Sequence, residues 1–124
     1  MTVEELYEQI GGNYAHAQQI LRKDKMISKY LLKLRESGVF EGLMEAGETL
    51  EPAAMFEKAH AMKGVCANLG LDKLADLVGV VTEEYRPGGT RAMTDEEVKA
   101  TLARIEELYG KTEEGIRAYE ASVE

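Results

Sequence analysis

The chain has 124 residues, of which 44% are apolar and 31% are charged. Because domains of roughly 100–200 residues are common, we expect one domain over residues 1–124. Fifteen Lys and Arg residues oppose 23 Asp and Glu residues, which gives a formal charge of −8. Nucleic acids and anionic membrane surfaces attract clustered cations, so this balance argues against both as partners.

Neither a membrane span nor a disulfide framework is predicted. The longest run of apolar residues and glycine, residues 77–81, is far shorter than the ~20 residues that cross a bilayer. Residues 1–5 are acidic where a secretory signal is basic, so we expect a cytoplasmic protein. The single cysteine, Cys66, leaves no internal disulfide or Cys-rich zinc site, and we expect it in the core.

Apolar residues recur every three or four positions between glycine and proline breaks, which is typical of amphipathic helices. Thr2 and Glu5 form a capping-box pattern for a short first helix that ends near Gly11. Asn13 is placed to cap a long second helix that reaches about Glu36. The apolar stripe expected on this second helix consists of Ala17, Ile20, Leu21, Ile27, Leu31 and Leu34.

The middle of the chain predicts a short element and then a long helix. A turn or short helix is expected before Gly47, on the basis of Phe40, Leu43 and Met44. Proline suits the first turn of a helix, so Pro52 marks the start of a third helix that runs to about Leu69. Gly70 is then expected to end it in a left-handed conformation.

The rest of the chain predicts two more helices. Asp72 is placed to cap a fourth helix, which residues 87–89 end, and Thr94 with Glu97 repeats the capping box at the start of a final helix. No segment alternates convincingly with the period of a strand. We therefore predict an all-α fold, an antiparallel four-helix bundle with a short additional N-terminal helix.

The helix over residues 52–69 separates its side chains into two faces. At 100° per residue, a core face is formed by Met55, Ala59, Met62, Cys66 and Leu69. His60 points away from that face, together with Lys63, Gly64 and Ala67. Glycine inside a helix costs ~1 kcal/mol relative to alanine, so Gly64 beside an outward histidine indicates that open space is needed there.

This outward face suits phosphoryl chemistry. Histidine is a covalent nucleophile, and the Lys63 ammonium would stabilise negative oxygens attached to the His60 ring. The backbone N–H groups around a mid-helix residue are already used by the helix, and no Gly-rich phosphate loop or Asp pair for Mg²⁺ is present. The pattern therefore predicts a phosphoryl carrier, with positioning and metal supplied by a partner.

The segment His60-Ala61-Met62-Lys63-Gly64, followed by Ala67-Asn68-Leu69-Gly70, resembles the H-x-L-K-G…A-N-L-G motif of histidine-containing phosphotransfer (HPt) domains. Met62 replaces the commoner leucine, which is a volume-conserving change. The motif covers about eleven residues, and the order of the helices is compatible with such a domain over essentially the whole chain.

The resemblance implies a phosphorelay intermediate of two-component signal transduction. His60 would be the phosphoacceptor that becomes phosphohistidine, Lys63 would stabilise the phosphate, and Gly64 would give a receiver steric access to the ring. The implied partners are response-regulator receiver domains and a hybrid sensor histidine kinase. No cofactor is expected on this chain, since Mg²⁺ would belong to the receiver, and a monomer suffices.

Four neighbours of His60 are expected to contact a partner, and three of them have a plainer alternative. Phe56 gives a receiver an apolar contact or packs at the core edge, and Glu57 hydrogen-bonds the ring or is merely solvated. Ala67 lies on the same face, and Asn68 contacts a receiver or caps the helix end. His16 lacks any accompanying Lys-Gly pattern and is expected to be an ordinary surface or boundary residue.

Two other functions stay open. The chain could be a helical docking module that binds a receiver or kinase without carrying phosphate, which would not require His60. It could also be a small metal-binding bundle, but two distant histidines and one core cysteine supply too few ligands for a zinc site. We expect no metal site.

Overall fold

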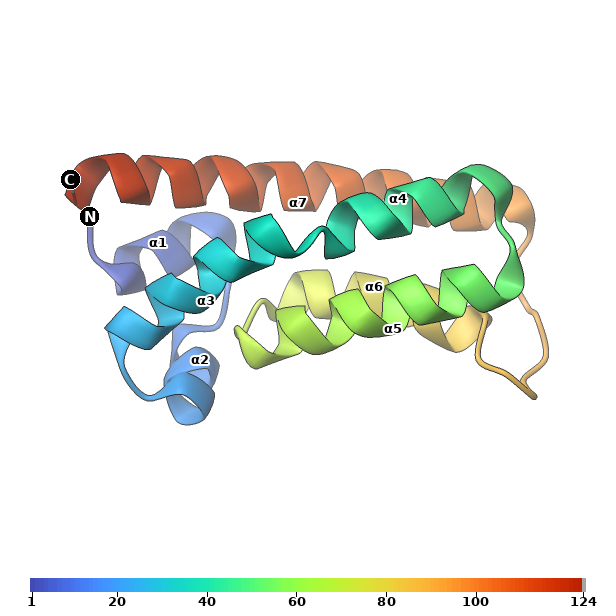
Figure 1. Ribbon diagram of the computed structural model, residues 1–124, viewed down its shortest axis with the longest axis horizontal. Coiled ribbons are helices and arrows are strands. Elements are labelled where there is room, and N and C mark those ends of the chain that lie inside the picture. Colours follow the sequence, from blue (N-terminus) through green and yellow to red (C-terminus); the bar gives the residue numbers. More distant parts are fainter. Residues whose placement is uncertain (124) are drawn as a thin grey trace.

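The computed structural model describes residues 1–123, and every regular element in this range is a helix (Figure 1). The elements are α1 (Val3–Ile10), α2 (Tyr14–Leu21), α3 (Asp24–Ser37), α4 (Val39–Thr49), α5 (Pro52–Asn68), α6 (Asp72–Glu84) and α7 (Asp95–Val123). The predicted all-α class is confirmed. Over these residues, no helix combines the length and apolar character that crossing a membrane requires.

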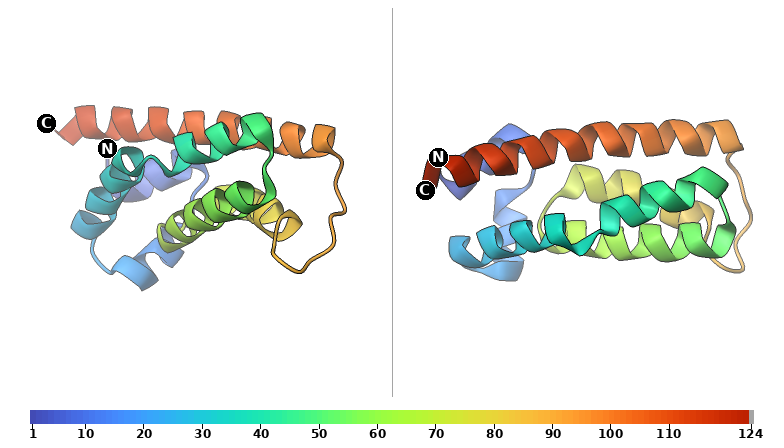
Figure 2. Two further views of the ribbon diagram at one scale, coloured as in Figure 1. Left: turned by 45° about the vertical axis from the view of Figure 1, so that its right-hand side comes forward. Right: turned by 45° about the horizontal axis from the view of Figure 1, so that its top comes forward.

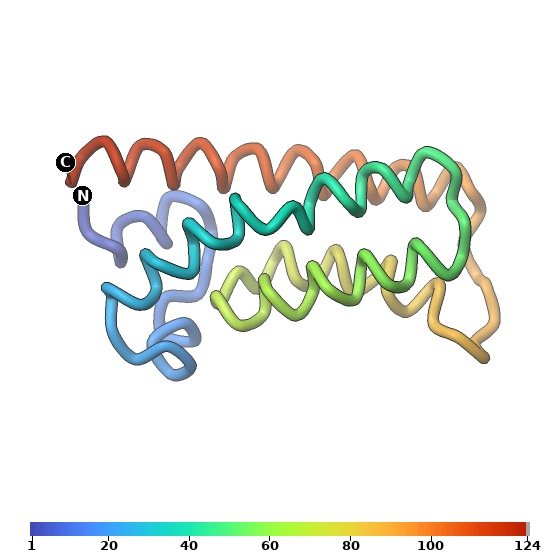
Figure 3. The backbone as a smooth tube through the Cα atoms, viewed as in Figure 1, coloured from blue at the N-terminus to red at the C-terminus, as the bar shows by residue number. Residues whose placement is uncertain are grey.

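The buried side chains of the helices form one hydrophobic core. α5 packs against α6 and α4, and α7 packs against the same two helices from the other side. α7 runs along the length of the molecule, and α1 lies beside its C-terminal part (Figure 2). α2 contacts α3 and the end of α5 (Figure 3).

The first helix forms as predicted. Thr2 Oγ1 accepts a hydrogen bond from the Glu5 backbone N–H at 3.1 Å, and Glu5 Oε1 accepts one from the Thr2 N–H at 2.9 Å. The helix ends at Gly11, which has a φ of 72°. α1 then packs closely on α7, because a Cβ at Gly115 would lie only 2.4 Å from Ile10 Cγ2.

The single long helix predicted over residues 13–36 is wrong, because the chain breaks into α2 and α3 at Arg22, where φ is 68°. The six-residue step from Leu21 to Ile27 would place these side chains about 120° apart on a straight helix. The break instead allows Ile27 to be fully buried. Ile20, which was predicted to be buried, is 42% exposed.

The element predicted before Gly47 is the eleven-residue helix α4, and it continues past this glycine rather than ending there. A Cβ at Gly47 would lie 2.7 Å from Leu102 Cδ1 of α7, so the glycine serves the close approach of two helices. The Phe40 ring stacks on the Tyr109 ring, with 4.1 Å between centroids and 4° between planes.

α6 begins at Asp72 itself, and its capping residue is Leu71 rather than the predicted Asp72. The Asp72 carboxylate instead joins the starts of two helices. Its Oδ1 lies 2.8 Å from Nδ1 of His16, and its Oδ2 accepts a hydrogen bond from Asn13 Nδ2 at 3.0 Å. The half-buried His16 therefore links α2 to α6 through Asp72, which agrees with the predicted role of a boundary residue.

The predicted capping box of the last helix is confirmed. Thr94 Oγ1 accepts from the Glu97 N–H at 3.1 Å, and Glu97 Oε1 accepts from the Thr94 N–H at 2.8 Å. The side chains that α7 buries include Val98, Leu102, Ile105, Tyr109 and Ile116.

Candidate functional site

Local sequence determines the position and rotation of α5. The Glu51 carboxylate caps its first turn by accepting from the N–H groups of Ala53 at 3.2 Å and Ala54 at 2.8 Å, and Pro52 follows as the first helical residue. Gly70 ends the segment with a φ of 67°, as predicted. The predicted core face is confirmed, with fully or almost fully buried side chains at Met55, Ala59, Met62, Cys66 and Leu69. Burial raises the pKa of the Cys66 thiol to about 12, which fits a core residue.

His60 is exposed in the middle of α5, on the face away from the core. Its ring stacks against the half-buried ring of Phe56, with 5.3 Å between centroids and 20° between planes. Unlike His16, His60 makes no hydrogen bond or ion pair with another residue of the range 1–123. The imidazole is therefore oriented by apolar stacking while its nitrogens stay accessible.

Lys63 lies one turn after His60 and is half-buried where α5 meets α6. Its side chain extends over Gly79 of α6, since a Cβ at Gly79 would lie 3.5 Å from Lys63 Cε and 3.7 Å from Nζ. A larger side chain at position 79 would displace the side chain of Lys63. The sequence did not single out Gly79, because a glycine inside a helix is not by itself a functional signal.

Gly64 opens directly to solvent. A Cβ placed on this residue would meet nothing within 4 Å, and Gly64 has an ordinary helical conformation without a positive φ. Neither packing nor backbone geometry therefore requires glycine at this position. The effect of glycine at position 64 that is visible in the structure is the open space beside His60.

The end of α6 and the segment just after it carry a charged pair that sequence reasoning missed. Arg86 donates to both carboxylate oxygens of Glu83, from Nε at 2.9 Å and from Nη2 at 2.7 Å. Its guanidinium carbon lies 5.4 Å from the centroid of the Phe56 ring. The hydrogen bond from Arg86 lowers the pKa of Glu83, and the charges of Arg86 and Lys63 act in the same direction.

This pair brings a second cation to the side of the His60 face that borders α6. A Glu and an Arg three residues apart are common on exposed helices, which is why the sequence alone gave no reason to select them. In the structure the Phe56 ring links the pair to His60, because it stacks with the imidazole and also lies near the Arg86 guanidinium.

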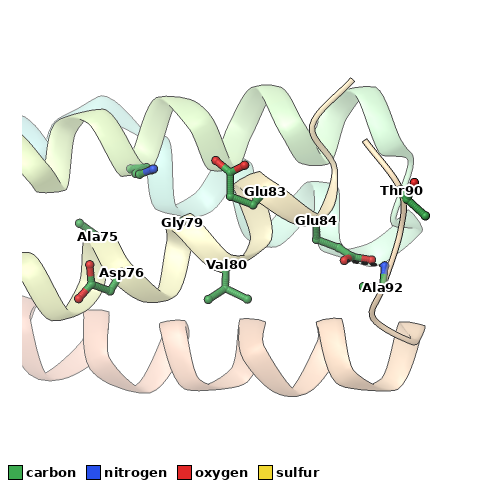
Figure 4. A pocket seen from close by; sticks show the side chains of 9 residues that line it. Ala75, Asp76, Gly79, Val80, Glu83, Glu84, Thr90 and Ala92 are labelled. Carbon is green, nitrogen blue, oxygen red and sulfur yellow. Dashed lines mark hydrogen bonds between the residues drawn. The ribbon is translucent and has the colours of Figure 1, made fainter. Parts of the chain in front are cut away.

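An open groove of about 570 Å³ borders the site along α6 (Figure 4). Lys63, Gly79 and Glu83 line the part next to α5, and the loop that precedes α7 closes the far end with Thr90 and Ala92. In Figure 4, Glu83 rises from α6 on the side opposite Val80. The groove therefore joins the lysine of the His60 face to a surface formed by α6.

The other predicted neighbours differ in their placement. Glu57 is exposed, and its nearest opposite charge is Lys58 Nζ at 3.9 Å, so it does not hydrogen-bond the His60 ring. Ala67 is half-buried at the edge of the core. Asn68 is the exposed last residue of α5, and the capping position belongs to Leu69 instead.

The assembled face presents an exposed imidazole ring, a lysine one turn further along α5 and open space at Gly64. Across residues 1–123, no group of three or more His, Cys, Asp or Glu side chains converges in a way that could hold a metal ion. An exposed imidazole has the chemistry of a nucleophile, and a lysine beside it can interact with an anionic group. No family model, curated protein or solved structure matches the chain.

Proposed function

We propose that the chain is an HPt domain, which accepts a phosphoryl group on His60 from a receiver-domain aspartate and passes it to another receiver. In this proposal the segment α3–α4 and the helices α5, α6 and α7 are the four members of an antiparallel bundle, and α1 and α2 are N-terminal additions. The single supporting observation is the exposed His60 ring, flanked by Lys63 and by the open space at Gly64.

In the proposed reaction, the lone pair of a neutral ring nitrogen of His60 attacks the phosphorus of an aspartyl phosphate on the receiver. The P–N bond forms as the P–O bond to the aspartate breaks, and the aspartate leaves as a carboxylate. Transfer to the next receiver is the reverse of this step. Mg²⁺ held by the receiver would neutralise the transferred charge, because phosphoryl transfer depends mainly on positioning and electrostatic stabilisation.

The chain's own contribution is to orient the ring and to supply positive charge. Stacking on Phe56 limits rotation of the imidazole, and Lys63 places an ammonium one turn away. Because the space at Gly64 is open, a receiver would approach the ring without meeting a side chain at this position. The chain acts as a carrier in a cytoplasmic relay and works as a monomer.

The test compares the wild type with His60→Gln after incubation with a phosphorylated receiver and Mg²⁺, by intact mass and phosphohistidine analysis. We expect the wild type to gain one acid-labile phosphoryl group and the variant to gain none. His16→Gln is the matched control, since it removes the other histidine and should leave uptake intact. Uptake that persists in His60→Gln with unchanged helicity would overturn the assignment.

The same experiment separates the carrier from the docking module. A module that binds a receiver or kinase without carrying phosphate would show no phosphohistidine, and its binding would survive His60→Ala. Binding should be measured by titration of the unphosphorylated receiver into each variant. This outcome would retain the surface and reject the proposed chemistry.

Two further substitutions test the roles of the flanking residues. Lys63→Ala should slow transfer or shorten the lifetime of the phosphohistidine by about tenfold or more, whereas Lys58→Ala on the same helix should change neither. Gly64→Gln should weaken receiver binding by filling the open space, and Gly110→Gln on α7 controls for the general effect of replacing an exposed helical glycine. Unchanged kinetics in both site variants would refute these roles.

A further inference from the structure

The charge of this acidic protein is distributed very unevenly along the chain. Residues 22–35 contain six Lys or Arg and a single Asp, so this segment carries a formal charge of +5. The whole chain carries −8, which leaves −13 on the remainder. The turn before α3, together with α3 as far as Arg35, is therefore a cationic region on an otherwise anionic molecule.

Three of these cations form a row along α3. Lys25, Lys29 and Lys33 are spaced four residues apart, which places them on one side of the helix, and all three are exposed. Within residues 1–123, none of them forms an ion pair. The Lys33 Nζ instead lies 5.0 Å from the centroid of the Tyr30 ring.

Beside the Lys33 end of this row is an apolar groove of about 410 Å³ between α2, α3 and the end of α5, whereas Lys25 and Lys29 border a second hollow between α3 and α7. Ile20 and Tyr30 line it although they are 42% and 36% exposed, and Lys33 is its only charged lining residue in the range 1–123. In a chain with 23 acidic residues, no carboxylate lines this groove. Exposed apolar side chains that gather at a hollow mark an interaction surface more often than scattered ones do.

We propose that the groove and the lysine row together bind an acidic amphipathic helix of a partner protein. Apolar side chains at helical spacing would fill the groove between Ile20 and Tyr30, and carboxylates on the adjoining face would lie along Lys25, Lys29 and Lys33. Complementary charge would also steer the partner to this end of the molecule. The proposal does not require His60 or phosphoryl transfer, although the groove includes Asn68 at the end of the helix that carries His60.

A protein segment fits this surface better than an anionic membrane does. The apolar part is concave, which suits inserted side chains, whereas a bilayer presents a broad flat surface. A membrane would also face the remainder of the protein, whose formal charge of −13 repels anionic lipid. A partner helix would contact only α2, α3 and the end of α5, and it would therefore avoid most of that repulsion.

The test begins with selection of binders to the full chain from a phage-displayed library of random peptides. We expect the enriched sequences to be acidic, with apolar residues three and four positions apart. A synthetic fluorescent copy of the best binder is then titrated against Lys29→Glu/Lys33→Glu and Ile20→Ser/Tyr30→Ser, with anisotropy as the readout. Each double variant should weaken binding by at least about tenfold, and raised ionic strength should weaken it as well.

The matched control is Lys99→Glu/Arg104→Glu, which makes the same change of net charge at exposed positions of α7. It should alter the affinity by less than about twofold. Equal weakening by both charge-reversal variants, or enrichment of peptides that are not acidic, would overturn the proposal.

Vesicles of phosphatidylserine and phosphatidylcholine test membrane binding directly. The proposal would be overturned if the protein bound these vesicles and selected no peptide. It would also be overturned if the protein bound neither vesicles nor peptides. His60→Gln should leave peptide binding unchanged, which separates this surface from the proposed function.

Discussion

A carboxylate with only 4% of its side chain exposed, that of Glu84, holds the loop between α6 and α7 in place. It accepts hydrogen bonds from Arg91 and from the backbone N–H groups of Ala92 at 3.1 Å and Met93 at 3.0 Å. Burial by itself raises the pKa of Glu84. The hydrogen bonds and the charge of Arg91 outweigh this effect, and the pKa is lower than the ordinary 4.5.

Because the pKa of Glu84 is lower in the folded state, its ionised form stabilises the fold. This contribution is complete above pH 4.5, the unfolded value, and is lost as the pH falls through the lower folded value. Glu84→Gln should therefore reduce the free energy of unfolding by about 1–3 kcal/mol at pH 7. Urea unfolding followed by circular dichroism measures this loss, and the difference from wild type should shrink with acidification below pH 4.5.

The control for this substitution is Glu106→Gln, because Glu106 is exposed on α7. It should change stability by less than about 0.5 kcal/mol at every pH. A Glu84→Gln deficit that stays constant from pH 7 into the acid range would show that shape rather than charge holds the loop.

At the scale of elements, the sequence predicts what depends on local chemistry and misses what depends on neighbours. Pro52, Gly70 and the stripe that starts at Met55 were sufficient to locate α5 and to predict that His60 points outward. The break at Arg22 contains neither glycine nor proline, and the signal for it was the six-residue gap in the apolar stripe. The sequence predicted that an element ends before Gly47. In the structure this glycine lies inside α4, and its lack of a side chain allows α7 to approach closely.

Glycines inside helices consequently divide into two kinds that only packing distinguishes. A Cβ at Gly110 would meet nothing within 4 Å, whereas one at Gly115 would lie 2.4 Å from Ile10 Cγ2. Gly110→Ala should therefore stabilise the protein by about 0.5–1 kcal/mol, because alanine loses less backbone entropy on folding. Gly115→Ala should destabilise it by about 1–3 kcal/mol, because α1 must move away from α7.

Thermal and urea unfolding of these two variants form a matched pair on one helix. Gly64→Ala joins the first group, since its site is equally open, and should stabilise the protein by a similar amount. If Gly115→Ala were as stable as Gly110→Ala, α1 would not pack on α7 in the way that the structure describes.

At the scale of the whole molecule, His60 and Lys63 stand on a helix that the rest of the chain holds in place. α5 and α6 pack on each other and are held by α4 and α7, and side chains from α1 to α7 share one core. The sequence shows which face of each helix is apolar, but the pairing of faces depends on side-chain shapes in three dimensions. Glu83 and Arg86 could not be assigned to the site for this reason.

A shared core predicts that the site is lost only when the whole protein unfolds. Ile105 of α7 is fully buried, and Ile105→Ala should reduce the free energy of unfolding by about 2–5 kcal/mol. Urea unfolding of this variant should show the His60 ring signal in NMR and the helical signal in circular dichroism disappearing together, since small single domains unfold cooperatively. The exposed neighbour Arg104→Ala should unfold close to wild type. Loss of the folded His60 signal at a lower urea concentration than the helical signal would instead show that α5 and α6 separate from α7 before the core melts.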